Sequence, residues 1–129
     1  MINMAGFDHF ALACKDLQTG VDYIESLTGV LAAPGGPHPG VGTRNALLSL
    51  GSDVYLEIIA VDPEQPEPNQ PRPFGIDDHE GPRLAAFAVH PDSGESLESV
   101  AEVIKSHGTD PGPVSSMSRR KPDGEEISW

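Results

Sequence analysis

The residues with the clearest chemical potential are one histidine near the N-terminus and one glutamate in the middle of the chain. His9 lies in the apolar stretch 7–14, and Glu57 is the one charged residue of the apolar stretch 54–61. An imidazole nitrogen and a carboxylate oxygen are donors that suit Zn, Ni, Mn or Fe(II). A carboxylate buried without a partner is costly, so Glu57 needs a metal ion, an arginine or water beside it. The pair therefore predicts either a metal site or a structural ion pair.

A second group of polar side chains follows the Pro/Gly-rich loop predicted over residues 34–40. Its members are His38, Thr43, Arg44 and Asn45. A guanidinium binds a carboxylate through two parallel hydrogen bonds, so Arg44 either binds a substrate carboxylate or neutralises Glu57. Because the Gly-x-Gly sequence at 40–42 precedes a strand and not a helix, it does not predict a phosphate-binding loop. We expect the four residues to form the substrate-binding rim of a site.

Strands and one helix must position these side chains. The apolar stretches predict strands over 7–14, 43–50 and 54–61, the last two joined by a turn at 51–53. Side chains alternate along a strand, so His9 shares a face with Phe7 and Ala11, and Glu57 shares one with Tyr55. Between the first two strands, a helix is predicted to begin after Asp16 and to end at Gly29.

The same order of elements begins again in the second half of the chain. Residues 62–82 hold six of the 13 prolines and six acidic residues, which predicts an extended linker. A strand over 84–89 and a helix between Ser96 and Gly108 follow. Two further strands are predicted over 111–118 and 125–129, with a turn at Asp123-Gly124 between them.

Composition limits the partners. Eight Lys and Arg against 20 Asp and Glu give a formal charge of −12, which disfavours nucleic acid. No run approaches the roughly 18 apolar residues of a membrane span, and the N-terminus does not resemble a signal peptide. Cys14 is the single cysteine, so no intrachain disulfide forms. We expect a cytoplasmic protein that binds a small molecule.

Residues 7–17, FDHFALACKDL, together with 38–51 and 54–59, resemble the glyoxalase-like branch of the vicinal oxygen chelate superfamily. The resemblance implies an α+β fold of paired βαβββ modules, in which an open, curved, mostly antiparallel sheet carries helices on its outer face. It implies one glyoxalase-like domain over 1–129, with module one at 5–61, the linker at 62–82 and module two at 83–129. The second module is one strand short of the first.

The resemblance also implies a function. Members hold a divalent metal through a histidine of the first strand and a glutamate of the fourth, which are His9 and Glu57 here. The metal chelates two neighbouring oxygens of a small molecule, and Glu57 is the expected catalytic residue. The superfamily includes lyases such as glyoxalase I, extradiol dioxygenases, epimerases and metal-free drug-binding proteins of the bleomycin resistance type. We expect metal-dependent lyase or dioxygenase chemistry, with metal-free binding of a small, cationic or aromatic molecule as the alternative.

The second module departs from the family pattern at its ligand positions. The residue that corresponds to His9 is Leu84 or Ala85, and neither side chain binds a metal. Two protein ligands make a weak site, so either a second chain completes it or no metal is held. Because an unpaired strand edge favours pairing with another chain, we expect a homodimer.

Overall fold

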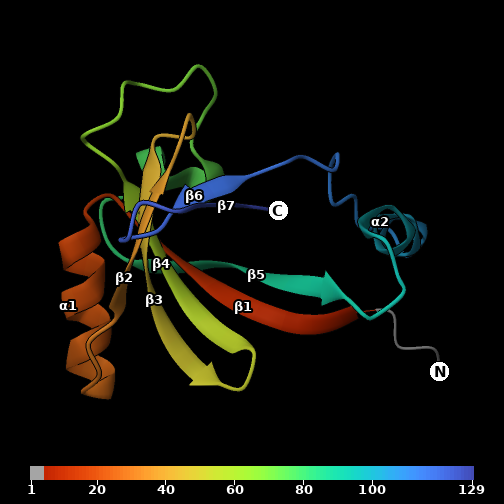
Figure 1. The fold of residues 1–129 in the computed structure, drawn as a ribbon, viewed down its shortest axis with the longest axis horizontal. Coiled ribbons are helices and arrows are strands. Elements are labelled where there is room, and N and C mark those ends of the chain that lie inside the picture. Colours follow the sequence, from red (N-terminus) through yellow and green to blue (C-terminus); the bar gives the residue numbers. More distant parts are fainter. Residues whose placement is uncertain (1–4) are drawn as a thin grey trace.

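The computed structural model describes residues 5–129, and its centre is a mixed sheet of five strands (Figure 1). The central strand β1 (Ala5–Cys14) pairs in parallel with β4 (Val54–Val61) and antiparallel with β5 (Arg83–Pro91). Strands β3 (Thr43–Gly51) and β2 (Ala33–His38) continue the sheet, giving the order β2-β3-β4-β1-β5. This α+β architecture with an open, curved sheet confirms the predicted fold class.

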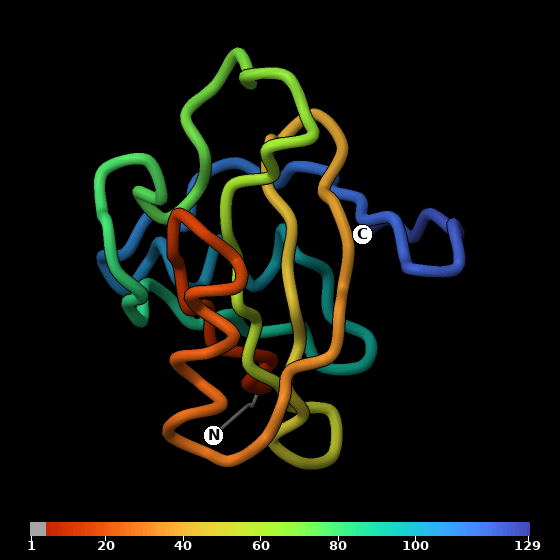
Figure 2. Tube along the Cα trace, turned by 90° about the vertical axis from the view of Figure 1, so that its left-hand side faces the viewer, coloured from red at the N-terminus to blue at the C-terminus, as the bar shows by residue number. Residues whose placement is uncertain are grey.

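Helix α1 (Leu17–Thr28) covers one face of the sheet (Figure 2). It begins where the sequence predicts, because the Asp16 carboxylate accepts a hydrogen bond from the backbone N–H of Thr19 at 2.8 Å. It ends at Gly29, whose φ of 70° is a conformation that glycine adopts without strain. The apolar side of α1 packs on the main core cluster, which consists of Leu12, Cys14, Val21, Ile24, Ala32, Ala46, Leu48, Leu56, Ile58 and Ala60.

Strand β2 occupies most of the segment that the sequence predicts as a loop. It contains Pro34 and Pro37, which lack the N–H needed for a full set of sheet hydrogen bonds. An outer strand tolerates proline, and β2 is the outermost strand of the sheet next to β3. The register shifts between Pro34 and Gly36, which marks a bulge there. The predicted loop is therefore an irregular edge strand.

Residues 62–82 are not a simple extended linker, because part of the segment packs on the sheet. The short 3-10 helix η1 (Pro73–Asp78) buries Ile76 against Ala13 and Ile59. This second apolar cluster lies on the face of the sheet opposite α1, at the C-terminal end of β1. One isoleucine thus fixes a segment that its proline and acid content predicts to be solvated.

Arg72 also anchors this segment, and only 7% of the residue is exposed. Its Nε donates to the backbone oxygen of Gly42 at 2.9 Å, and its Nη1 contacts Glu67 and Asp77 at 2.9 and 2.7 Å. A buried guanidinium needs such partners, because an unpaired buried charge is strongly unfavourable. Arg72 thereby joins the segment to the connection between β2 and β3.

The second module contributes one strand to the large sheet. After β5, helix α2 (Leu97–Ser106) begins at Ser96, whose hydroxyl accepts a hydrogen bond from the Ser99 N–H at 3.1 Å. The helix lies beyond the end of β5 at one side of the molecule (Figure 1). Within residues 5–129, no helix combines the length and apolar character that crossing a membrane requires.

The C-terminal residues form a hairpin of their own. Strands β6 (Ser118–Arg120) and β7 (Glu126–Ser128) pair around the predicted turn, but they make a separate two-stranded sheet. The strand predicted over 111–118 is wrong except at its last residue. The hairpin lies against β2, where Nη1 of Arg119 donates to the backbone oxygen of Gly35 at 2.8 Å.

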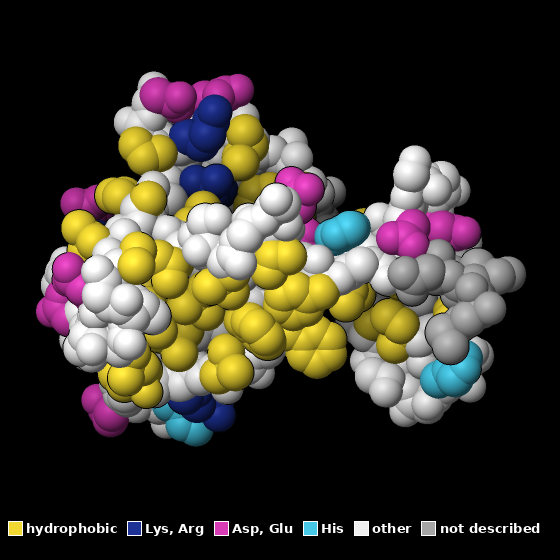
Figure 3. Space-filling view, turned by 90° about the horizontal axis from the view of Figure 1, so that it is seen from below, with side chains coloured by type: hydrophobic (Ala, Val, Ile, Leu, Met, Phe, Trp, Pro, Cys, Tyr) yellow, Lys and Arg dark blue, Asp and Glu magenta, His cyan; other side chains and the backbone are white. Residues whose placement is uncertain are grey.

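The outer edge of β5 has no neighbouring strand in the described chain. Apolar side chains beside this edge are exposed, and Figure 3 shows apolar side chains gathered over the corresponding underside of the molecule. On β5, Leu84, Phe87 and Val89 are 62%, 68% and 40% exposed, and Phe10 of β1, which pairs with Phe87, is 37% exposed. Exposed apolar patches of this kind mark interaction surfaces.

Candidate functional site

His9 and Glu57 lie together on the face of the sheet opposite α1. The parallel register places Ala11 opposite Glu57 and His9 opposite Tyr55, so all four side chains share one face. Nε2 of His9 is 3.2 Å from Oε2 of Glu57. Two metal–ligand bonds of about 2.1 Å each are long enough to span this separation. The structure thus brings together the two residues that the sequence predicts as metal ligands.

Asp8 and Tyr55 fix the orientation of the His9 ring. Oδ1 of Asp8 accepts a hydrogen bond from Nδ1 of His9 at 2.6 Å, which leaves Nε2 directed at Glu57. The ring of Tyr55 stacks on the imidazole with 4.5 Å between centroids and 12° between planes. A carboxylate on the far nitrogen is the usual second partner of a metal-binding histidine.

A bulge in β1 makes the Asp8 contact possible. Strict alternation predicts Asp8 on the face opposite His9 and Phe7 on the same face, but the pairing of β1 with β5 shifts register between Phe7 and His9. Phe7 instead contacts the ring of Phe10, with 4.7 Å between centroids. The predicted shared face of Phe7 and His9 is therefore wrong, because the extra residue of a bulge interrupts the period of two.

The electrostatics of the pair favour the charged forms of both residues. Burial by itself raises the pKa of Glu57, but hydrogen bonds from His9 and Asn45 outweigh it and leave the pKa below its usual value. The hydrogen bond to Glu57 raises the pKa of His9 against the opposing effect of burial, and Asp8 adds to the rise. Each residue thus favours the charged form of the other, and wherever the ring is protonated a metal must displace the proton of His9 to bind.

Asn45 links Glu57 to a second histidine. Its Nδ2 donates to Oε1 of Glu57 at 3.1 Å and to Nε2 of His38 at 3.2 Å, so each amide hydrogen has an acceptor. Nδ1 of His38 then donates to the hydroxyl of Thr43 at 2.9 Å. Burial lowers the pKa of His38, which fits the neutral ring that this hydrogen-bond pattern requires.

His38, Thr43 and Asn45 lie beneath the site and not at its rim. Their exposed fractions are 1%, 0% and 5%, which is too little for direct contact with a substrate in this conformation. The sequence predicts a rim because it predicts a loop over 34–40. The strand that forms there carries His38 into the sheet, where the three residues support Glu57.

Arg44 lies on the other face of the sheet. It pairs with Ala60 and alternates with Thr43 and Asn45, so it shares the α1 side with Ala46. The structure therefore corrects the prediction for this residue: it neither neutralises Glu57 nor lies beside the site. Arg44 and Ala46 are two residues apart on one strand, so they share a face. This spacing is the signal in the sequence that places Arg44 on the opposite face from Thr43 and Asn45.

Residues 5–129 contain no group of three or more His, Cys, Asp or Glu side chains that could hold a metal ion. In the second module, Leu84 pairs with Leu12 on β1 and supplies no ligand there. His9 and Glu57 thus fit a metal as a two-donor site. The remaining coordination positions would be left to water, to the oxygens of a ligand or to another chain.

Sequence reasoning missed two residues of the C-terminal hairpin. The ring of Trp129 meets the ring of His38 edge-on, with 6.5 Å between centroids, and Arg119 contacts Gly35. The neighbouring basic residues Arg120 and Lys121 pair instead with Glu126 and Glu125 of the same hairpin. Strand alternation is the signal that distinguishes Arg119 from Arg120.

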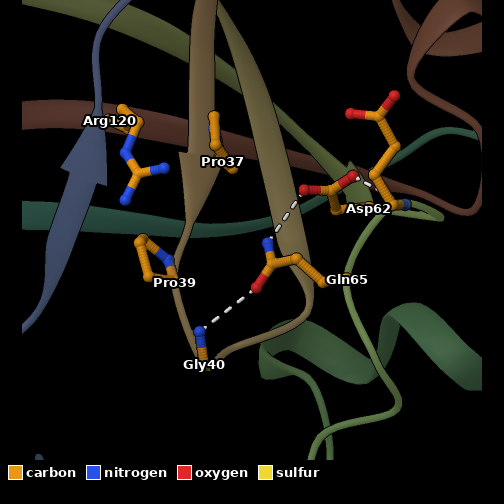
Figure 4. Close-up of a pocket in the computed structure, with 7 residues that line it drawn as sticks. Pro37, Pro39, Gly40, Asp62, Gln65 and Arg120 are labelled. Atoms are coloured by element: carbon orange, nitrogen blue, oxygen red, sulfur yellow. Dashed lines mark hydrogen bonds between the residues drawn. The ribbon is translucent and has the colours of Figure 1, made fainter. Parts of the chain in front are cut away.

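A surface hollow beside the β2–β3 connection is separate from the His9–Glu57 pair (Figure 4). It is lined by Pro37, Pro39, Gly40, Asp62, Glu64, Gln65 and Arg120. Gln65 spans it, donating from Nε2 to Oδ2 of Asp62 at 2.8 Å and accepting from the Gly40 N–H at 3.1 Å. These hydrogen bonds hold the start of the 62–82 segment against the connection.

The open, curved sheet, with α1 on one face and the His9–Glu57 pair on the other, has the features that the resemblance to the vicinal oxygen chelate superfamily implies. The family model for the glyoxalase-like domain matches residues 7–129, and the chain belongs to this family. A similar solved structure is methylmalonyl-CoA epimerase from Mycobacterium tuberculosis, with 20% identity and a TM-score of 0.59 over 95% of this chain and 76% of that one. At this identity the likeness shows the fold alone. No curated protein sequence matches the chain.

Proposed function

We propose that this protein binds a divalent metal ion between His9 and Glu57 and uses it to hold a small molecule through two adjacent oxygens. The observation that carries the proposal is the 3.2 Å separation of Nε2 and Oε2 on the open face of the sheet. Zn, Ni, Mn and Fe(II) all suit this donor pair. Such a metal supplies Lewis-acid polarisation of a bound oxygen.

The surrounding residues prepare both donors for this role. Asp8 holds Nδ1 of His9, so the lone pair of Nε2 points at the site once the ring is neutral. Asn45 holds Oε1 of Glu57, which leaves Oε2 as the oxygen nearest His9. Because Glu57 would hold the metal and would lie beside the bound molecule, we assign it the catalytic role in lyase or dioxygenase chemistry of the glyoxalase type.

A metal-free binding protein is the second candidate. The observation that favours it is that His9 and Glu57 satisfy each other as an ion pair, while residues 5–129 supply no third metal ligand. In that case the open face captures a small molecule without reacting with it. The two candidates differ in whether the protein takes up metal.

Metal binding to purified protein tests the proposal. Protein prepared without chelator is analysed for metal content and titrated calorimetrically with Ni²⁺, Zn²⁺ and Mn²⁺, alongside Glu57→Gln and the exposed control Glu25→Gln on α1. We expect about one equivalent per site, at least a roughly 10-fold loss of affinity in Glu57→Gln, and no change in Glu25→Gln. Absence of metal uptake, with no shift of melting temperature, would favour the metal-free candidate.

A further inference from the structure

The C-terminal hairpin presents one of its faces to the end of the sheet that holds His38. Met117 and Trp129 exchange two backbone hydrogen bonds at 2.8 and 2.9 Å, and Arg119 pairs with Ile127. Residues opposite each other in an antiparallel pair share a face, so these four side chains lie on the same side of the hairpin. Trp129 meets the His38 ring on that side, which places Arg119 on the side of the hairpin nearest the site.

Arg119 is a cation without a carboxylate. Within 4.0 Å of its guanidinium no Asp or Glu of residues 5–129 is found, whereas its neighbours Arg120 and Lys121 both have acidic partners. Nη1 donates to the backbone oxygen of Gly35, and Nη2 and Nε make no hydrogen bond to the described residues. A half-buried guanidinium with unused donors has capacity for an anionic ligand.

Two chains of contacts connect this side of the hairpin to Glu57. The ring of Trp129 meets the ring of His38, and Nε2 of His38 is 4.0 Å from Oε1 of Glu57. Arg119 donates to Gly35, which adjoins the side chain of Asn45, and Asn45 donates to Oε1 of Glu57. The Arg119 side of the hairpin therefore adjoins the residues that support Glu57.

We propose that Arg119 binds the carboxylate of the ligand and that the ligand is a small 2-oxo or 2-hydroxy acid. A guanidinium binds a carboxylate through two parallel hydrogen bonds. Because the chain has a net charge of −12, a local positive charge is needed to attract an anionic ligand, and Arg119 supplies it. In a 2-oxo or 2-hydroxy acid, a second oxygen lies next to the carboxylate. This assignment rests on the proposed function, which gives the adjacent oxygens of the ligand to a metal at His9 and Glu57.

Pyruvate and its neutral methyl ester test the proposal as a matched pair. Trp129 is the single tryptophan, so its fluorescence reports binding beside the hairpin. We expect pyruvate to bind at least about 10-fold more tightly than methyl pyruvate, as a charge-assisted bidentate pair implies. Arg119→Ala should remove this preference, Arg119→Lys should retain part of it, and Arg120→Ala should leave it intact because Arg120 is exposed and paired with Glu126.

The titrations are performed on metal-free and on Ni²⁺-loaded protein, which separates the two proposals. A preference for pyruvate that Arg119→Ala abolishes in either state supports the carboxylate assignment, even if the titrations of the native protein with metal show that none binds. Equal affinity for pyruvate and methyl pyruvate in the native protein overturns it, as does a preference that survives in Arg119→Ala. The melting temperature of each variant is recorded to show that it is folded. Arg119→Lys keeps the positive charge but removes the two parallel N–H donors of the guanidinium, so it tests their contribution separately.

Discussion

The side-chain amide of Asn45 bridges Glu57 and His38, donating one hydrogen to each at 3.1 and 3.2 Å. This contact fixes the orientation of the Glu57 carboxylate, because the amide holds Oε1 while Oε2 faces His9. The bridge requires space at Gly35, because a Cβ there would lie 2.0 Å from Oδ1 of Asn45. The bulge in β2 and the geometry of Glu57 are therefore connected through one amide group.

Gly35→Ala is expected to displace Asn45 and weaken the site. The added methyl group cannot coexist with the amide oxygen, so the free energy of unfolding should fall by about 1–3 kcal/mol. Gly81→Ala is the matched control, since a Cβ at Gly81 meets no atom within 4 Å. Urea unfolding of both variants is the measurement. Equal stability of the two would show that Asn45 moves aside without cost.

Removing the carboxylate of Asp8 is expected to weaken metal binding through the orientation of His9. Asp8→Ala should lower the affinity for Ni²⁺ by about 10- to 100-fold, because the ring loses the partner of its Nδ1. Asp8→Asn should lose less, since its amide oxygen still accepts that hydrogen bond. Competition titration against a chromophoric chelator measures both, and Glu25→Ala corrects for the change in net charge. An unchanged affinity in Asp8→Ala would contradict the orienting role.

The stability of the metal-free protein should depend on pH through the same ion pair. The pKa of His9 is raised, so its contribution is complete below 6.5 and is lost as the pH rises through the raised value. The pKa of Glu57 is lowered, so its contribution is complete above 4.5 and is lost as the pH falls through the lowered value. The cost of Glu57→Gln should therefore be largest between these two limits.

Urea unfolding of the native protein and of Glu57→Gln across this pH range tests that expectation. Because the pair is partly buried, we expect a difference of about 1–3 kcal/mol inside the window. The difference should shrink at more alkaline pH, where His9 is neutral, and at more acidic pH, where Glu57 is protonated. A difference that stays constant with pH would mean that Glu57 stabilises the fold without an ionic partner.

The unpaired edge of β5 should mediate association between two copies of the chain. Phe87 and Leu84 are 68% and 62% exposed beside this edge, so pairing would bury apolar surface and satisfy free backbone groups. We expect a dimer at micromolar concentration, and Phe87→Lys should weaken it by about 100-fold. Light scattering measures the mass, with Leu27→Lys on α1 as the exposed control. A monomer at all concentrations would contradict this expectation.

The sequence predicts those features of the fold that depend on local physics. Asp16 and Gly29 bound α1 because a side-chain cap and a left-handed glycine act within one helical turn. The common face of His9 and Glu57 follows from alternation within two strands, once the strands are paired in the right register. The resemblance to the glyoxalase-like family implies only that the two residues share a site, and the register comes from the structure.

Features that depend on non-local contacts could not be predicted from the same patterns. The prolines of β2 predict a loop, and only its place beside β3 explains how they are tolerated. Ile76 carries no signal that it fills a second apolar cluster. Strand alternation places Arg119 and Arg120 on opposite sides of the hairpin, but it does not predict which side meets β2. Each of these outcomes is decided by contacts between segments distant in the chain.

The parallel pairing of β1 with β4 has a consequence for how the protein acquires its chemistry. β4 lies between β3 and β1, so the imidazole and the carboxylate are brought together by a pairing between strands that are distant in the chain. A slip of one residue in that ladder would turn Glu57 toward α1 and separate the two groups. The proposed metal binding therefore depends on this long-range pairing, and its recovery during refolding should coincide with closure of the whole sheet.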